Sequence, residues 1–103
     1  MKNLSYHEQK DIENVKRLRE LIGTLPLFCP EFFRGIEPRT SSRTRIAYAY
    51  DLNVFFHFLQ EENPYFRVKD IKEISLDDLD QITVTDLEEY MEYLKYRDNA
   101  QGQ

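Results

Sequence analysis

The fold is decided by residues 39–60, which read RTSSRTRIAYAYDLNVFFHFLQ. From residue 43 to residue 60 apolar side chains recur at helical spacing, which predicts one long amphipathic helix. Its predicted core face contains Tyr48, Leu52, Phe55 and Leu59, widened by Ala47, Val54, Phe56 and Phe58. The polar side carries Arg43, Tyr50, Asn53, His57 and Gln60. We expect the rest of the chain to cover this helix.

The start of this helix differs in chemistry from its body. Hydroxyl side chains stand among three arginines in the run Arg39-Thr40-Ser41-Ser42-Arg43-Thr44-Arg45. The first turn of a helix also presents backbone N–H groups without intrahelical partners. Hydroxyls, guanidinium groups and free N–H groups together suit a phosphate oxygen, so this run is a candidate anion-binding site.

Length and composition are typical of one small folded domain. The chain has 103 residues, of which 41% are hydrophobic and 14% aromatic, a composition that argues against disorder throughout. The single cysteine, Cys29, excludes an internal disulfide and favours a reducing compartment. The first residues contain no long apolar run, so we expect a soluble cytoplasmic protein without a signal peptide or membrane span.

Charge is unevenly distributed along the chain. The net charge of −5 opposes a nucleic-acid surface that covers the whole domain. However, Arg34, Arg39, Arg43 and Arg45 cluster around the head of the central helix, whereas residues 77–92 are strongly acidic. One end can therefore face phosphate while the other repels it. The alternative is that both are ordinary solvated surfaces.

The N-terminal segment, residues 5–25, predicts an amphipathic helix. One half of its wheel contains the apolar residues Ile12, Val15, Leu18, Ile22 and Leu25. Ser5 and Glu8 have the spacing of a capping box, which would start the helix. We expect it either to pack on the core or to serve as an arm that docks on another protomer or on DNA.

A shorter helix is expected between residues 25 and 37. Pro30 fits its first turn, and Gly35 and Pro38 are expected to stop it. Phe28, Phe32 and Phe33 are expected to pack on the aromatic face of the central helix. A ligand pocket formed by these aromatic residues is the less favoured alternative.

The chain after the central helix predicts two short turns and one more long helix. The turns are expected at residues 70–73 and 75–79, the second started by Ser75 and Asp78. Thr83 and Asp86 have capping-box spacing and start a helix predicted to run from Val84 to about Arg97. Its apolar face contains Val84, Leu87, Met91 and Leu94, with Tyr90, Tyr93 and Tyr96 along an adjoining edge. Residues 98–103 carry no core-forming signal, so order is expected to be lost there.

Together these patterns predict an all-α fold, a small orthogonal bundle of three main helices plus short helical turns. Its division is an N-terminal helix or arm at 1–25, a helical domain at 26–97, and a disordered tail or the start of a further segment at 98–103. The predicted core consists of Tyr48, Leu52, Phe55, Leu59, Leu87, Met91 and Leu94.

No catalytic or metal-binding motif is present in the sequence. There is no glycine-rich phosphate loop, no H-E-x-x-H and no C-x-x-C. His57 lies on the polar side of the central helix, where a surface role is favoured over that of a general base. We therefore expect no enzyme activity in this chain, no cofactor and no small-molecule ligand.

Two motifs carry a resemblance to a known family. The first is Ser42-x-Thr44-x3-Tyr48-x2-Asp51-Leu52-x2-Phe55, and the second is Ile82-Thr83-x2-Asp86-Leu87-x3-Met91-x2-Leu94. In order and spacing they resemble the N-terminal core-binding domain, a SAM-like domain, of tyrosine recombinases of the phage-integrase type. The resemblance covers roughly residues 25–96.

The resemblance implies that the chain grips duplex DNA without covalent chemistry, for DNA integration or recombination. It also implies a catalytic domain downstream, a further terminal helix, and contacts with other recombinase protomers. The implied DNA-binding residues are Arg39, Ser41, Ser42, Arg43, Thr44, Arg45 and Tyr48, with Lys95 and Arg97 as weaker candidates. The alternative from a different class is a helical protein-interaction module whose acidic surface binds a basic partner.

Overall fold

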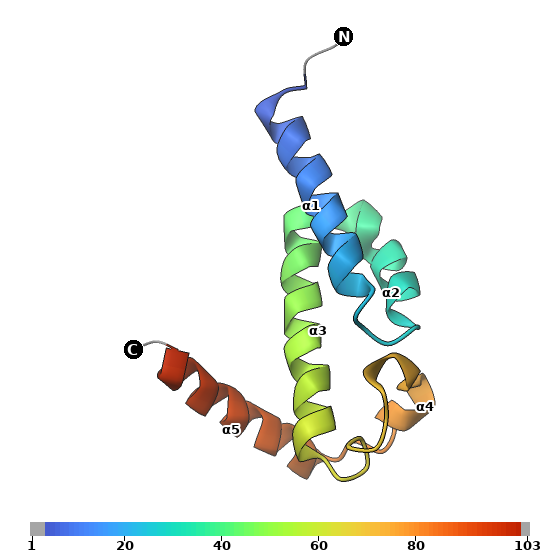
Figure 1. The fold of residues 1–103 in the computed structure, drawn as a ribbon, viewed down its shortest axis with the longest axis vertical. Coiled ribbons are helices and arrows are strands. Elements are labelled where there is room, and N and C mark those ends of the chain that lie inside the picture. The colour runs from blue at the N-terminus through green and yellow to red at the C-terminus, as the bar shows by residue number, and fades with distance from the viewer. Residues whose placement is uncertain (1–3, 102–103) are drawn as a thin grey trace.

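The computed structural model describes residues 4–101, with side chains through Arg97, and this part of the chain is helical without strands. Four helices have eight or more residues: α1 (Tyr6–Ile22), α2 (Cys29–Ile36), α3 (Ser42–Glu62) and α5 (Val84–Gln101). Three short elements join them: η1 (Glu37–Arg39), η2 (Ile71–Glu73) and α4 (Leu76–Leu79). The predicted all-α class is confirmed, and α3 forms the axis of the molecule (Figure 1).

Helix starts follow the predicted capping boxes. The Ser5 hydroxyl accepts a hydrogen bond from the N–H of Glu8, whose carboxylate accepts from the Ser5 N–H. Ser75 and Asp78 form the same reciprocal pair at α4. Thr83 and Asp86 form it at α5. Each box satisfies two N–H groups that the helix leaves without partners, which fixes where the helix begins.

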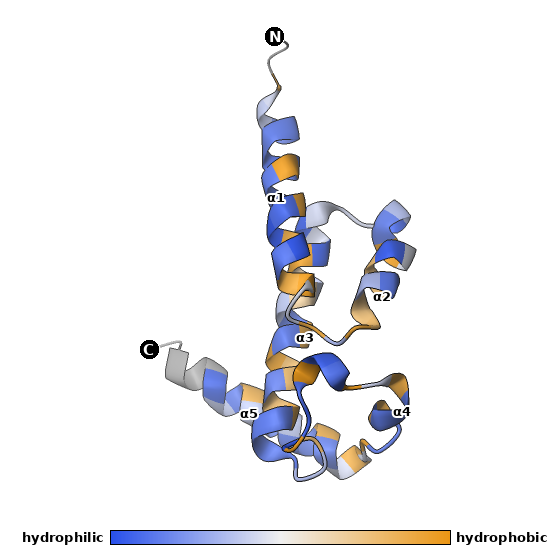
Figure 2. Cartoon of the chain, turned by 45° about the vertical axis from the view of Figure 1, so that its right-hand side comes forward, coloured by the Kyte–Doolittle hydropathy of each residue, from blue (hydrophilic) through white to orange (hydrophobic). Residues whose placement is uncertain are grey.

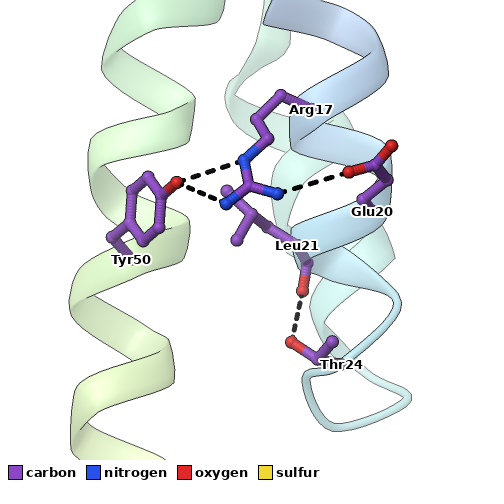
Figure 3. A network of polar contacts seen from close by, with 5 residues as sticks. All are labelled: Arg17, Glu20, Leu21, Thr24 and Tyr50. Carbon is purple, nitrogen blue, oxygen red and sulfur yellow. Dashed lines mark hydrogen bonds and ion pairs between the residues drawn. The ribbon is translucent and has the colours of Figure 1, made fainter.

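Helix α1 packs along α3, which is the first of the two arrangements expected for it (Figures 1 and 3). Its own residues Leu18 and Leu21 are buried. At its side the guanidinium of Arg17 donates to the hydroxyl of Tyr50 through Nε at 3.1 Å and Nη2 at 2.7 Å. These hydrogen bonds raise the pKa of Arg17, with a smaller contribution from Glu20. This polar contact thus links α1 to α3 at the surface, beside the buried leucines.

The buried stripe of α3 is rotated from the predicted one. Ser42, Ala49 and Phe56 mark it. Ser42 is hydrogen-bonded to residues of α1, whereas Phe56 meets Phe28 at the start of α2. Tyr48, predicted as core, is 43% exposed. Leu59 is fully buried as predicted, and Phe55 is half-buried against the core. The buried core cluster of the described residues consists of Leu18, Leu21, Leu25, Cys29, Phe33, Ala49, Phe56, Phe58, Leu59, Phe66, Ile71 and Ile74, and Pro26 is buried as well.

Helix α2 brings its aromatic residues to α3 as expected, with one exception. Phe28 meets Phe56 edge to face, with ring centroids 6.3 Å apart, and Phe33 is buried. Phe32 stays 47% exposed, and its ring meets that of Phe33 edge to face with centroids 5.2 Å apart. Gly35 does not stop the helix, which runs through it to Ile36 and continues as η1.

Helix α5 differs most from expectation. It touches α3 through Tyr90 and Tyr93, whose rings lie 5.1 and 5.0 Å from that of Phe58. This contact turns the predicted core face outward, so Leu87 is 47% and Met91 65% exposed. The predicted burial of these two residues is wrong. The helix also continues to Gln101, four residues beyond its predicted end, while residues 102–103 lie outside the described part.

The molecule is elongated as a result. Its radius of gyration is 16.3 Å, against about 13 Å for a compact domain of about 100 residues. Its principal extents are 55 × 36 × 22 Å, and α5 extends sideways from the C-terminal half of α3 (Figure 1). One consequence is that the head of α3 and the last turns of α5 belong to different surfaces.

Candidate nucleic-acid interface

Ser41 and Thr44 serve the start of α3 itself. Ser41 is the N-cap, and its hydroxyl accepts a hydrogen bond of 3.1 Å from the Thr44 N–H. The same hydroxyl donates to Thr44 Oγ1 at 3.0 Å. Two of the predicted phosphate donors are thus occupied with capping, although both remain at or near the surface.

Ser42 is buried, which was not expected for a residue that binds phosphate. It is 5% exposed, donates a 2.7 Å hydrogen bond to Asp11 Oδ1, and accepts a longer one from Asn14 Nδ2. Both partners belong to α1. Ser42 is therefore part of the contact between α1 and α3, and its hydroxyl is already hydrogen-bonded there.

Arg45 also departs from the expectation, because its side chain is only 7% exposed. Its Nη1 donates to the Thr40 carbonyl at 2.6 Å, to Thr40 Oγ1 at 3.1 Å and to the Glu37 carbonyl at 3.2 Å. These acceptors belong to the first residue of η1 and to the residue that follows this element. Arg45 thus ties η1 to α3 from inside the fold, and it is removed from the surface that would meet DNA.

Arg39 and Arg43 remain as the cations of the helix head. Both are exposed, and within residues 4–97 neither makes an ion pair or side-chain hydrogen bond. Arg39 ends η1 and Arg43 lies in the first turn of α3. Tyr48 is one turn further along α3 and is 43% exposed. These side chains are available to a ligand without breaking an existing contact.

A groove beside the helix head adds residues that the sequence did not indicate. It measures about 510 Å³ and lies between α1 and α3, where His7 and Lys10 join Arg43. Lys10 is held in a weak surface pair with Glu13 at 3.6 Å. Only the pairing of α1 with α3 brings these side chains to Arg43, and no local motif encodes that pairing.

Lys95 and Arg97 lie on α5, away from the head of α3 (Figure 1). Lys95 is exposed and Arg97 is half-buried. The acidic residues Glu88, Glu89 and Glu92 lie on the same helix and are exposed. The structure therefore does not join these two cations to the cluster formed by Arg39 and Arg43.

Comparison with protein-family models, curated proteins and solved structures finds no match to this chain. The class that the fold and the site define is a small all-α protein with an exposed cationic helix head. Within residues 4–97 no three His, Cys, Asp or Glu side chains gather in a way that could hold a metal ion. No helix in the described part is both long and apolar enough to cross a membrane.

Proposed function

We propose that this chain binds the phosphate backbone of duplex DNA through Arg39 and Arg43. The observation that carries the proposal is that both guanidinium groups are exposed and make no ion pair within residues 4–97. Arginine recognises phosphate through two N–H groups at once, which favours it over lysine for this task. The biological setting proposed is that of a core-binding domain of a tyrosine recombinase, acting in DNA integration or recombination.

The resemblance and the structure divide the motif into two sets of residues. Ser42, Leu52 and Phe55 are buried or half-buried and support the fold. Thr44 and Tyr48 lie at or near the surface of α3, beside Arg43. A protein that binds DNA through the start of α3 needs some motif residues in its core and others at its surface. The catalytic domain and the other protomers of such a recombinase would lie outside this chain.

Binding should be weak and depend on salt. Two to three phosphate contacts on a chain with a net charge of −5 support only nonspecific affinity, with a dissociation constant of roughly 10⁻⁴ to 10⁻⁶ M. Each neutralised phosphate contributes about 0.9 to the slope of log K against log salt. Sequence preference should be small, because phosphate contacts carry no base information.

The experiment is fluorescence anisotropy with a labelled duplex at low salt. Arg39→Gln/Arg43→Gln should abolish binding. If some binding remains, its affinity should depend less steeply on salt than that of the parent chain. Lys16→Gln/Arg67→Gln is the matched control, since it removes the same charge from exposed positions that do not belong to the run 39–45. Equal loss in both variants would show diffuse attraction and refute the assigned site.

One observation favours a second candidate, a protein-interaction module. Leu87 and Met91 are exposed on α5 beside Glu88 and Glu92. An apolar strip flanked by acids suits a basic amphipathic helix. No duplex binding by the parent chain, even at low salt, would favour this candidate over DNA.

A further inference from the structure

A concave pocket lies between the C-terminal half of α1, the loop after it, and α2. It measures about 530 Å³, within the roughly 300–1,000 Å³ range of small-molecule sites. The apolar loop that forms one wall joins α1 to α2 (Figure 2). The apolar lining includes Val15, Leu18, Ile22, Leu25, Pro26 and Phe33.

The charge of the pocket is opposite to that of the chain. Arg19, Arg34, Arg45 and Lys72 line it, and Glu37 is the one acid among the lining residues. Four cations and one acid give a formal charge of +3, whereas the whole chain carries −5. None of the four cations has a carboxylate within 4.0 Å in residues 4–97. The lining is therefore complementary to a ligand that is both apolar and anionic.

Arg45 supplies an independent observation. More than nine-tenths of this side chain is buried, yet its hydrogen bonds to Thr40 and Glu37 all come from Nη1. Its Nε and Nη2 groups have no partner within residues 4–97. No fully buried side-chain nitrogen or oxygen in that range lacks a partner, so these two groups keep some accessible surface. Arg45 lines the pocket, and a buried cation without a counter-charge is costly.

We propose that this pocket binds a carboxylate that carries an aliphatic chain. The carboxylate would accept hydrogen bonds from Arg45 Nε and Nη2, with Arg19 and Arg34 supplying further positive charge. The aliphatic chain of the ligand would lie on Leu18, Ile22 and Phe33. A carboxylate matches the two adjacent N–H groups of one guanidinium edge, which makes such pairs short and strong.

The apolar lining distinguishes this pocket chemically from the proposed DNA-binding surface. A nucleic-acid backbone carries polar sugar and phosphate groups, which would leave the apolar lining without a partner. Arg39 and Arg43, which carry the DNA proposal, do not line the pocket. The two proposals therefore stand or fall independently.

The test uses octanoate as probe and 1-octanol as its neutral counterpart, both titrated into the full chain by calorimetry. Octanoate should bind one-to-one, and 1-octanol at least about tenfold more weakly, because a charged hydrogen bond contributes a factor of that size. Arg19→Gln/Arg34→Gln should weaken octanoate at least about tenfold. Lys16→Gln/Arg67→Gln, which removes the same charge outside the pocket, should leave affinity unchanged.

A second measurement holds even if the pocket variant fails to fold. The ¹H–¹⁵N resonance of Arg45 Nε in the parent chain should shift as octanoate is added and stay in place with 1-octanol. Equal affinity for both probes, an unshifted Arg45 signal, or displacement of octanoate by a short DNA duplex would each overturn the proposal.

Discussion

The hydroxyl of Tyr65 donates a 2.8 Å hydrogen bond to Asp78 Oδ1, which joins the segment after α3 to α4. Lys69 Nζ lies 3.4 Å from the same oxygen, and the Ser75 N–H donates to Asp78 Oδ2 at 2.9 Å. These contacts, the Ser75 backbone hydrogen bond first, lower the pKa of Asp78 from 3.8 to about 2. Its charged form is thus the one that the fold stabilises.

Stability should therefore depend on Asp78 at low pH. A carboxyl whose folded pKa lies below its unfolded value stabilises the protein above the unfolded value of 3.8. That stability is lost as pH falls toward about 2. The melting temperature of the parent should drop across this window, and that of Asp78→Asn should drop less. Asp80→Asn, at an exposed neighbouring position, should behave like the parent. Parallel curves for all three proteins would contradict the assignment.

The core assignment can be tested by truncation of Phe56. This side chain is 2% exposed, so Phe56→Ala should cost about 3–5 kcal/mol in free energy of unfolding. Met91 is 65% exposed, and Met91→Ala should change the free energy of unfolding by no more than about 0.5 kcal/mol. Urea unfolding followed by circular dichroism measures both. Similar losses would mean that α5 packs more closely than its exposure indicates.

Deletion of residues 1–22 should leave α3 without its cover. Leu18 and Leu21 belong to the core, and Arg17 anchors α1 to Tyr50. The shortened chain should aggregate or lose amide dispersion in ¹H–¹⁵N spectra. Well-dispersed spectra from a monomeric shortened chain would show that α1 is an accessory arm.

Cys29 should be inert in the folded protein. It is 1% exposed, and burial raises the pKa of its thiol to about 11. Since the thiolate is the reactive form, an aromatic disulfide reagent at pH 8 should react slowly with the native chain. It should react at once after unfolding in guanidinium. Fast reaction under both conditions would show that the loop before α2 opens readily.

Local signals in the sequence predicted the helices well. The capping pairs Ser5/Glu8, Ser75/Asp78 and Thr83/Asp86 act between neighbours, so their effect can be read without knowing the tertiary fold. The burial pattern could not be read in this way. Apolar periodicity gives the direction of a helix face only approximately, and the neighbouring helices decide which part of it is covered. Tyr48 and Met91 were misassigned for this reason.

The candidate site was predictable only in outline. The sequence places arginines at the head of α3, but the side chain of Arg45 turns to the carbonyl groups of Thr40 and Glu37 instead of to solvent. Arg43, two residues earlier, remains exposed because residues two positions apart point to different sides of a helix. Proximity in sequence therefore could not separate the exposed arginine from the buried one.

The attachment of α5 has a consequence for its hydrogen exchange. The rings of Tyr90 and Tyr93 hold the helix against Phe58, whereas Leu94 and Tyr96 are not among the apolar residues packed against the core. Local opening of that part costs far less than unfolding of the domain. Amides from Leu94 to Arg97 should therefore exchange with deuterium long before those at the centre of α3, at rates insensitive to mutations that destabilise the core.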